Sequence, residues 1–307
     1  MANEAKIVMI GSGCMDEYYE MDFVPKLGEK VCCKALGEKV GGMIGNAAAV
    51  AASYGMRTYI MDTVNGGSSA RKVLDDFQQA GVLLDLVRVD ESLPEVKCLI
   101  FLKDGERIVY VIPTAKRELV PDAEQEAILK SADYVYTTLA ELRCFARPLE
   151  VVDMLHAAGT RLVLDVEYLD EDAKELEWNL LRQADILFIN TEGDDHLREK
   201  VGPDYRRELT RHSVLVLTEG ADGCSVFDSG HDGFHIPAYR VKPVDTTGAG
   251  DTFNASFVYG LSCGWTVEEA GRFANAAAAR AILGLGARSG AVGEAAVRRF
   301  METGKEK

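Results

Sequence analysis

Short apolar runs alternate with amphipathic or alanine-rich segments along most of this chain. The runs of strand length are residues 6–10, 134–137, 162–166, 186–190 and 214–218. The segments with the apolar spacing of helices lie near residues 147–158, 172–183, 254–261 and 267–282. Strands that alternate with helices are typical of a mostly parallel sheet whose two faces are covered by helices. The pattern therefore predicts an α/β fold built on such a sheet.

Two stretches interrupt this alternation. Residues 16–36 are mixed in character and are interpreted as strands or loops rather than as a helix. Residues 96–102 and 107–112 are strand-like runs around Asp104-Gly105, a dipeptide that favours a hairpin. These stretches predict β structure outside the regular alternation. A plain edge hairpin of the main sheet is the alternative interpretation.

Composition limits the classes of partner. The 307 residues can bury a substantial core, and 47% apolar with 27% charged residues is ordinary for a globular protein. A net charge of −15 argues against nucleic acid or an anionic membrane as a partner, because both need basic patches. The opening residues do not resemble a signal peptide, and no apolar run has transmembrane length. The seven cysteines fit no disulfide or zinc spacing, which predicts ordinary thiols in a reducing cytoplasm.

The main candidate for chemistry is the motif Asp245-Thr246-Thr247-Gly248-Ala249-Gly250-Asp251, which leads directly into a helical pattern. The first amides of a helix lack intrahelical partners and point outward at the positive end of the helix dipole. Gly248 and Gly250 remove Cβ atoms that would hinder the approach of a phosphate. A carboxylate at Asp251 beside these donors suggests a base next to a charged transfer centre. The alternative is a turn capped by an aspartate, and a P-loop is excluded because no Gly-Lys-Ser/Thr follows.

Two other glycine-rich turns are candidates for ligand binding. Gly41–Asn46 precedes the alanine-rich residues 47–52, where glycines allow a ligand to approach the backbone and Asn46 offers a donor and an acceptor. Thr218–Gly223 follows an apolar run, and its glycines and hydroxyl group can approach phosphate oxygens. Each of these motifs is also explained as a tight turn.

In kind and in order, these three motifs resemble those of the ribokinase-like (PfkB) carbohydrate kinase family. Residues 245–253 are similar to its C-terminal signature, Gly41–Asn46 to its first signature, and Thr218–Gly223 to its turn near the nucleotide phosphates. The resemblance extends from Ile7 to about Ala287. It implies a single ribokinase-like domain over residues 1–307, with three layers and a small β-sheet lid built from approximately residues 15–40 and 95–113.

The resemblance also implies an activity. An ATP-dependent sugar kinase would transfer the γ-phosphate to a hydroxyl group, a primary one in the favoured interpretation. Asp251 would act as general base, and the amides of Gly248, Ala249 and Gly250 would form the anion hole. The implied cofactors are ATP and Mg²⁺, with K⁺ as a further ion, and the implied assembly is a homodimer through the lid.

The other positions carried over from the family fall into three groups. Those expected to bind the sugar are Asp16, Gly41, Gly42, Asn46 and Glu141. Those expected near the nucleotide are Asn190, Thr218, Gly220, Gly223, Asn275 and Gly286. Those expected at ions are Asp245 and Thr247 for a monovalent cation and Glu192, acting through water, for magnesium.

The chain departs from the family pattern in two places. Gly193 stands where the family has the glutamate of an Asn-x-x-Glu motif, and Asn65–Ala70 replaces an acidic loop. These departures leave the magnesium affinity open and motivate the hypothesis of a catalytically weak, sugar-binding regulatory protein. A nucleoside kinase is a further hypothesis, in which Tyr18, Tyr19 and Phe23 would form an apolar wall. Asp165, although it lies at a strand end, is interpreted as a helix cap or exposed loop residue.

Overall fold

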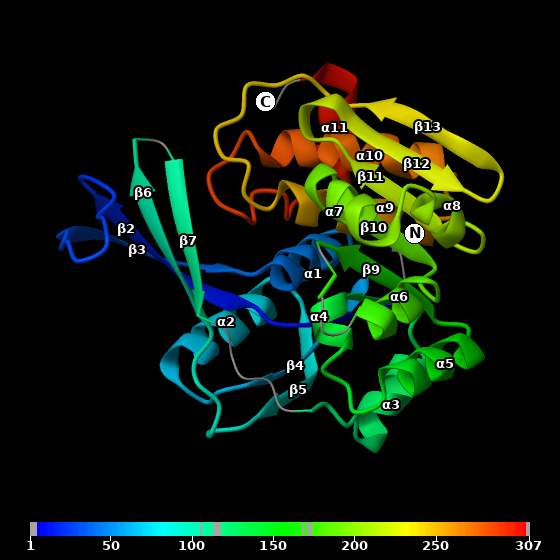
Figure 1. Cartoon of the computed structure of the whole chain (residues 1–307), viewed down its shortest axis with the longest axis horizontal. Helices are drawn as coiled ribbons and strands as arrows, with labels where there is room; N and C mark the ends of the chain where they lie inside the picture. The colour runs from blue at the N-terminus through cyan, green and yellow to red at the C-terminus, as the bar shows by residue number, and fades with distance from the viewer. Residues whose placement is uncertain (1–4, 105, 113–117, 168, 171–173, 305–307) are drawn as a thin grey trace.

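The computed structural model describes residues 5–104, 106–112, 118–167, 169–170 and 174–304 (Figure 1). Its strands are β1 Lys6–Ile10, β2 Cys14–Met21, β3 Cys33–Gly41, β4 Arg57–Val64, β5 Leu83–Val89, β6 Lys97–Lys103, β7 Glu106–Ile112, β8 Tyr134–Thr138, β9 Arg161–Val166, β10 Ile186–Asn190, β11 Val214–Thr218, β12 Gly223–Asp228 and β13 His231–Pro237. Its helices are α1 Met43–Ser53, α2 Ser68–Gln79, α3 Ala123–Lys130, α4 Leu139–Leu142, α5 Pro148–Ala158, α6 Lys174–Leu181, α7 Thr191–Val201, α8 Tyr205–Leu209, α9 Ala249–Ser262, α10 Val267–Ala281 and α11 Glu294–Thr303, with a 3₁₀ turn at Gly220–Asp222.

The main sheet has the order β13-β12-β11-β10-β9-β8-β1-β4-β5 among the described strands. All neighbours from β11 to β5 pair in parallel, and only the two pairings of β12, with β11 and with β13, are antiparallel. Because the strands are parallel and joined through helices, their carboxyl ends meet at one edge, where ligands bind in such folds. The predicted α/β fold with a mostly parallel sheet is confirmed.

Helices cover both faces of this sheet, which makes three layers. In β1, Ile7 and Met9 belong to a core with α1, α2, α9, α10 and α11, whereas Val8 and Ile10 belong to a second core with α3 to α8. A strand buried on both faces is apolar at nearly every position, which explains the continuous apolar run at residues 7–10. Each fully buried large side chain contributes about 1.5–3 kcal/mol of hydrophobic stabilisation.

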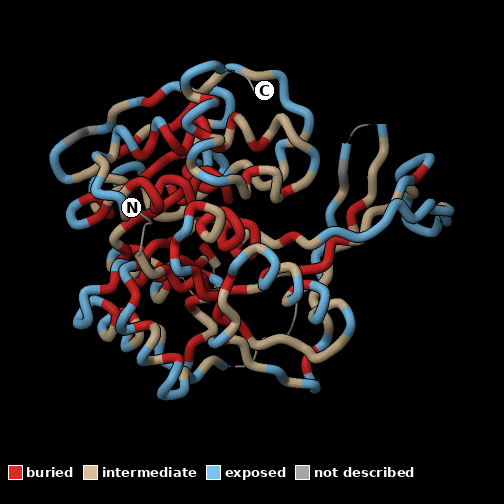
Figure 2. The backbone as a smooth tube through the Cα atoms, turned by 180° about the vertical axis from the view of Figure 1, so that it is seen from behind, coloured by how far each residue is buried: buried red, intermediate tan, exposed pale blue. Residues whose placement is uncertain are grey.

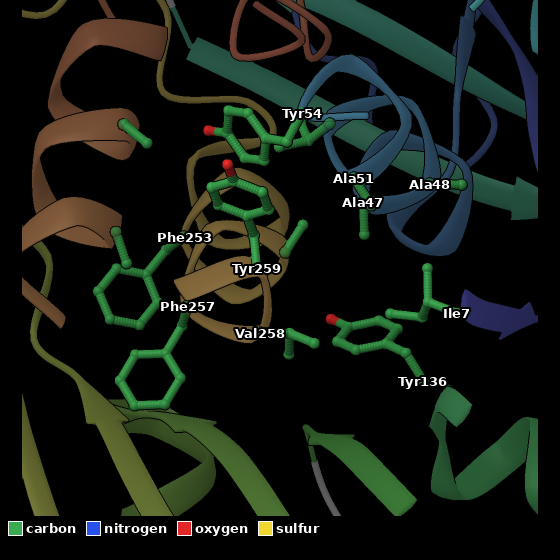
Figure 3. Close-up of a cluster of buried hydrophobic side chains, with 14 of the residues drawn as sticks. Ile7, Ala47, Ala48, Ala51, Tyr54, Tyr136, Phe253, Phe257, Val258 and Tyr259 are labelled. Atoms are coloured by element: carbon green, nitrogen blue, oxygen red, sulfur yellow. The ribbon is translucent and has the colours of Figure 1, made fainter. Parts of the chain in front are cut away.

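Packing of α9 places the glycine-rich motif at the edge of the sheet. Phe253 and Phe257 lie against Phe188 of β10, with the rings of Phe188 and Phe257 5.5 Å apart in an edge-to-face arrangement. Figure 3 shows Phe253 and Phe257 on one side of α9 and Ala47 and Ala51 of α1 on its other side. The alanine-rich sequence of α1 lets its backbone approach α9 closely, so the starts of α1 and α9 are brought together.

A second sheet, here called the lid, has the order β3-β2-β6-β7 and extends away from the main body (Figure 1). Its strands come from the two stretches that interrupted the helix–strand alternation. Most of β3 is exposed, as Figure 2 shows by the pale colour of this part of the backbone. The alternative of an edge hairpin of the main sheet is wrong, because β6 pairs with β2 and β7 pairs with β6, so the hairpin belongs to the second sheet.

Several helices were not predicted, among them α3, α7 and α11 at residues 123–130, 191–201 and 294–303. Their sequences are mostly polar, and few of their apolar residues are buried, such as Val297 and Phe300 in α11, so no apolar run marks them. Within the described part of the chain, no helix is both long and apolar enough to cross a membrane.

Candidate active site

The glycine-rich motif forms the start of α9, where its amides precede the helical hydrogen bonds. Gly248 is the N-cap with a φ of 77°, and a Cβ atom there would overlap the carbonyl oxygen of Ala287. Glycine is therefore required by conformation and by space. The first helical bond joins the amide of Thr252 to the carbonyl of Gly248 at 2.9 Å, so the amides of Gly250 and Asp251 lie ahead of it. A Cβ atom at Gly250 would meet no described atom within 4 Å, so the space beside this backbone is open.

Asp251 lies in the first turn of α9 and is only 8% exposed. Its Oδ2 accepts a hydrogen bond of 2.8 Å from Nδ2 of Asn46 in α1, which joins two motifs 205 positions apart. Burial raises the pKa of Asp251 to about 7, the hydrogen bond from Asn46 lowers it, and the charges of Asp165 and Glu167 raise it. A carboxylate with this pKa changes protonation near neutral pH, where a general base is most effective.

Asp165, at the end of β9, belongs to the same polar network, so its interpretation as a cap or exposed residue was wrong. Its Oδ2 accepts hydrogen bonds of 3.0 Å from the hydroxyl of Tyr136 and 3.0 Å from Nδ2 of Asn254 in α9. Burial raises the pKa of Asp165 to about 6, and its two hydrogen bonds lower it. Asp165 therefore fastens α9 to the sheet and places a titratable charge near Asp251.

The residues expected to bind the sugar surround the loop that follows β1. Asp16 is buried in β2, and a Cβ atom at Gly41 would overlap its carboxylate. A Cβ atom at Gly42 would lie 2.9 Å from the carbonyl oxygen of Ser12, and the carbonyl of Gly42 accepts the amide of Asn46 at 2.8 Å. Through these contacts the structure brings Asp16, Gly41, Gly42 and Asn46 together at the start of α1, where Asn46 also bonds Asp251.

Glu141, also expected at the sugar, lies in the short helix α4 after β8. The hydroxyl oxygen of Thr138 caps this helix by accepting the amide of Glu141 at 3.2 Å. The Cγ of Glu141 is 3.2 Å from where a Cβ atom of Gly11 would be, and Ile44 of α1 approaches the same point, so Glu141 lies beside the end of β1 near the start of α1. A role of Glu141 toward a sugar stays a prediction.

Asp245 holds the loop before α9 against the segment that follows α10. Its Oδ1 accepts the amide of Thr247 at 3.0 Å, and its Oδ2 accepts the amide of Gly286 at 2.9 Å. The backbone adds a bond of 2.7 Å from the amide of Val244 to the carbonyl of Ile282. Asp245 is thus a cap of the glycine loop, the alternative that the sequence left open. Binding of a monovalent cation by Asp245 and Thr247 stays a prediction.

A cavity of about 640 Å³ separates this loop from the lid. Asp245, Thr246 and Thr247 line one wall, and Tyr18, Leu36, Ile100 and Leu102 of the lid are among the residues of the other. Lys39 of β3, which sequence reasoning missed, lies between them. Its ammonium group is 5.5 Å from the ring centre of Tyr18 and 3.6 Å from where a Cβ atom of Gly286 would be.

The other expected nucleotide residues lie farther along the strand edge. Thr218 ends β11 and its hydroxyl donates to the carbonyl of Ile189 at 3.4 Å, while Gly220 and Gly223 form the tight turn into β12. Asn275 is buried in α10 and donates to the carbonyl of Ile236 at 3.0 Å. This bond fastens α10 to β13, so the amide of Asn275 has a structural use, and contact with a nucleotide stays a prediction.

The segment expected to bind magnesium is the first turn of α7. The Oδ1 atom of Asn190 caps this helix by accepting the amide of Gly193 at 2.7 Å. A Cβ atom at Gly193 would lie 2.9 Å from the carbonyl oxygen of Glu167 and 2.9 Å from Cγ1 of Ile189, so a glutamate does not fit there. Asp194 is buried and bonds Arg206 of α8 at 2.7 Å, which removes it from this site.

A cavity of about 210 Å³ nevertheless lies at this position, lined by Glu167, Asn190, Glu192 and His196. Burial, followed by the negative charge of Glu192, raises the pKa of Glu167. Two carboxylates with an asparagine oxygen nearby suit a hard cation such as Mg²⁺. Sequence reasoning missed Glu167, although its position just after β9 was a signal that could have found it.

Comparison with known proteins agrees with this geometry. Residues 4–292 match the family described as pfkB family carbohydrate kinase. The ribokinase of Bacillus subtilis (strain 168) is 30% identical over 295 residues, covering 92% of this chain and 95% of that protein. The nucleoside kinase of Methanothermobacter thermautotrophicus is 27% identical over 293 residues, covering 91% and 89%.

The fold is also that of a solved structure. The ribokinase of Arabidopsis thaliana, complexed with ribose and ATP, superposes with a TM-score of 0.79 at 24% identity, covering 97% of this chain and 99% of that one. The family expected from the glycine-rich motifs is therefore confirmed over nearly the whole length. This chain belongs to the pfkB family of carbohydrate kinases.

Proposed function

We propose that this protein is an ATP-dependent kinase that phosphorylates a hydroxyl group of a small sugar. The favoured acceptor is a primary hydroxyl group. The observation that carries the proposal is the hydrogen bond between Asn46 and Asp251 at the start of α9. It supports the proposal because it joins the carboxylate of Asp251, at the amides that begin α9, to Asn46, one of the residues expected to hold the acceptor. The pKa of Asp251, about 7, suits a base that must accept a proton near neutral pH.

The transfer itself follows from these positions. Asp251 removes the proton from the acceptor hydroxyl while the hydroxyl oxygen attacks the γ-phosphorus of ATP. The bond between the γ-phosphorus and the β–γ bridging oxygen breaks, and ADP is released. The amides of Gly248 and Gly250 stabilise the charge on the transferring phosphoryl group. The amide of Ala249 contributes less, because it also donates to the carbonyl of Thr246 at 3.3 Å.

Other charges support the same reaction. Lys39 adds a positive charge on the lid side of the large cavity. Glu167, Asn190 and Glu192 would hold Mg²⁺, which neutralises phosphate charge when bound. Lid closure would exclude water and limit the hydrolysis of ATP. Dependence on K⁺ and a cytoplasmic location remain predictions.

Two other functions of the same fold are tested by one experiment. A nucleoside kinase is favoured by the apolar wall of Tyr18, Leu36 and Ile100 in the large cavity, and a weak regulatory protein by the loss of the acidic loop at residues 65–70. ADP release is measured over a panel of ketoses, aldoses, sugar acids and nucleosides, with binding measured in parallel. Turnover of a sugar supports the proposal, turnover of nucleosides alone favours the second function, and sugar binding without turnover the third.

The pH dependence of kcat/KM tests the base and its neighbour Asp165. Because the deprotonated form of Asp251 is the active one, kcat/KM is expected to rise with pH up to about 7 and then level off. Asp165→Asn can keep the hydrogen bond from Tyr136 but loses one negative charge, which should lower the pKa of Asp251. The rising limb of the plot of kcat/KM against pH should therefore move to lower pH by about one unit. A limb that stays in place would show that the charge of Asp165 does not act on the base.

We also propose that a second copy of the chain covers the lid. Strand β7 lies at the edge of the lid sheet and exposes Val109 at 45%, Tyr110 at 56% and Val111 at 64%. Such an edge strand pairs readily with another chain. Tyr110→Asp is expected to raise the dimer dissociation constant at least about tenfold, because it places a charged side chain in the interface. Light scattering over a range of protein concentrations measures this constant. The control is Val120→Asp, at an apolar position outside the lid that is 72% exposed, and this variant should leave the dimer unchanged. A wild-type protein that is monomeric in the same measurement would contradict the proposal.

A further inference from the structure

Two cysteines and an aspartate meet on the lid. Cys14 and Asp16 lie two positions apart on β2, so their side chains share one face. Strand β6 pairs in parallel with β2 and places Cys98 directly beside Asp16. The Sγ of Cys14 is 3.2 Å from Oδ1 of Asp16 and 3.8 Å from Sγ of Cys98. One potential ligand atom from each residue lies within 4.8 Å of the other two.

These distances match a tetrahedral zinc centre. With Zn–S bonds of about 2.3 Å, two sulfur ligands at the tetrahedral angle are about 3.8 Å apart, and a sulfur and an oxygen ligand about 3.5 Å. The observed separations of 3.8 Å and 3.2 Å therefore need only small movements to take up the ion. Thiolates select a soft or borderline cation, so Zn²⁺ fits this set and Mg²⁺ does not.

The surroundings favour three protein ligands and one open position. Cys14 and Asp16 are 7% and 8% exposed, whereas Cys98 is only partly buried and offers a path from the solvent. The absence of a Cβ atom at Gly41 leaves room for the carboxylate of Asp16. A fourth ligand would be a water molecule entering from the side of Cys98.

We propose that Cys14, Asp16 and Cys98 form a Zn²⁺ site with two thiolates and one carboxylate, and that the ion competes with the sugar for Asp16. The site rests on geometry alone, whereas the competition rests on the proposed function, in which Asp16 accepts sugar hydroxyls. Binding releases the protons of the two thiols. Because the bound ion takes up the carboxylate, an enzyme carrying Zn²⁺ would bind its sugar more weakly.

Metal binding is tested without any substrate. The full chain, kept reduced with a phosphine, is titrated with Zn²⁺ by calorimetry and with Co²⁺ by absorption spectroscopy. We expect one equivalent of Zn²⁺ and a thiolate-to-cobalt charge-transfer band. Cys14→Ser and Cys98→Ser should each weaken Zn²⁺ binding at least about tenfold, since each removes one thiolate that would bind the ion directly. Cys32→Ser/Cys33→Ser removes the adjacent exposed pair and should change neither signal.

The outcomes separate the site from the activity. Equal Zn²⁺ affinity in wild type, Cys14→Ser and Cys98→Ser, or loss of binding in Cys32→Ser/Cys33→Ser, overturns the site whether or not the protein phosphorylates a sugar. If Cys14→Ser unfolds in a thermal melt, Cys98→Ser, at the more exposed position, decides the result. Once a sugar substrate is found, Zn²⁺ should raise its KM in the wild type and not in Cys98→Ser. An unchanged KM in the wild type at saturating Zn²⁺ overturns the competition.

Discussion

Asp251→Asn is expected to lower kcat by about 10²–10⁴-fold while the affinities for ATP and sugar change little. Asparagine keeps the size of the side chain and can still accept the hydrogen bond from Asn46, but it cannot take a proton from the acceptor hydroxyl. The check is steady-state kinetics together with calorimetric binding of both substrates. Turnover within about tenfold of wild type would contradict the assignment of Asp251 as the base.

The same variant makes a prediction about stability. The pKa of Asp251 is about 7 in the folded protein and 3.8 for an ordinary aspartate, so the folded state binds the proton more tightly. Stability from this group is present below about pH 4 and is lost as the pH rises through 7. At pH 8 the charged carboxylate costs the fold up to about 4 kcal/mol. Asp251→Asn should therefore melt several degrees higher than wild type at pH 8 and at nearly the same temperature at pH 4.

Gly248→Ala is expected to lower the free energy of unfolding by about 2–4 kcal/mol and turnover by at least about tenfold. The residue adopts a φ of 77°, which costs an alanine about 1–2 kcal/mol, and its Cβ atom would overlap the carbonyl of Ala287. The backbone must shift to relieve this overlap, and the amides at the start of α9 move with it. Denaturant melts and kinetics measure the two effects.

Gly250→Ala is the matched control for this loop. A Cβ atom at Gly250 meets no described atom within 4 Å, and alanine is the better helix former by about 1 kcal/mol, so stability should be equal or higher. If a phosphate approaches this backbone, the added methyl group should still raise the KM for ATP. Equal stability losses in the two variants would show that conformation at Gly248 is not the cause, and an unchanged KM in Gly250→Ala would place the phosphate elsewhere.

Local sequence was sufficient wherever the chemistry depends on neighbouring residues. The motif Gly248-Ala249-Gly250-Asp251 already implies a helix start with amides ahead of the hydrogen-bond ladder, because capping and glycine conformations are set within a few residues. The continuous apolar runs likewise predict a buried parallel sheet, since strands covered on both faces are apolar at most positions. The lid could be expected only as two irregular β stretches, because nothing local says which strands pair.

Tertiary structure decided what depends on distant segments. The fit of Gly193 against the backbone of Glu167, and the place of Asp165 between Tyr136 and Asn254, follow from strands and helices packed together over long sequence separations. The cysteines are the clearest case, because their spacing along the chain fits no metal motif. The parallel register of β2 and β6 nevertheless sets Cys98 beside Asp16, 82 positions away along the chain. Sequence alone thus determined the family motifs and the glycine-rich helix start, while strand pairing, a long-range choice made by packing, determined which side chains lie together.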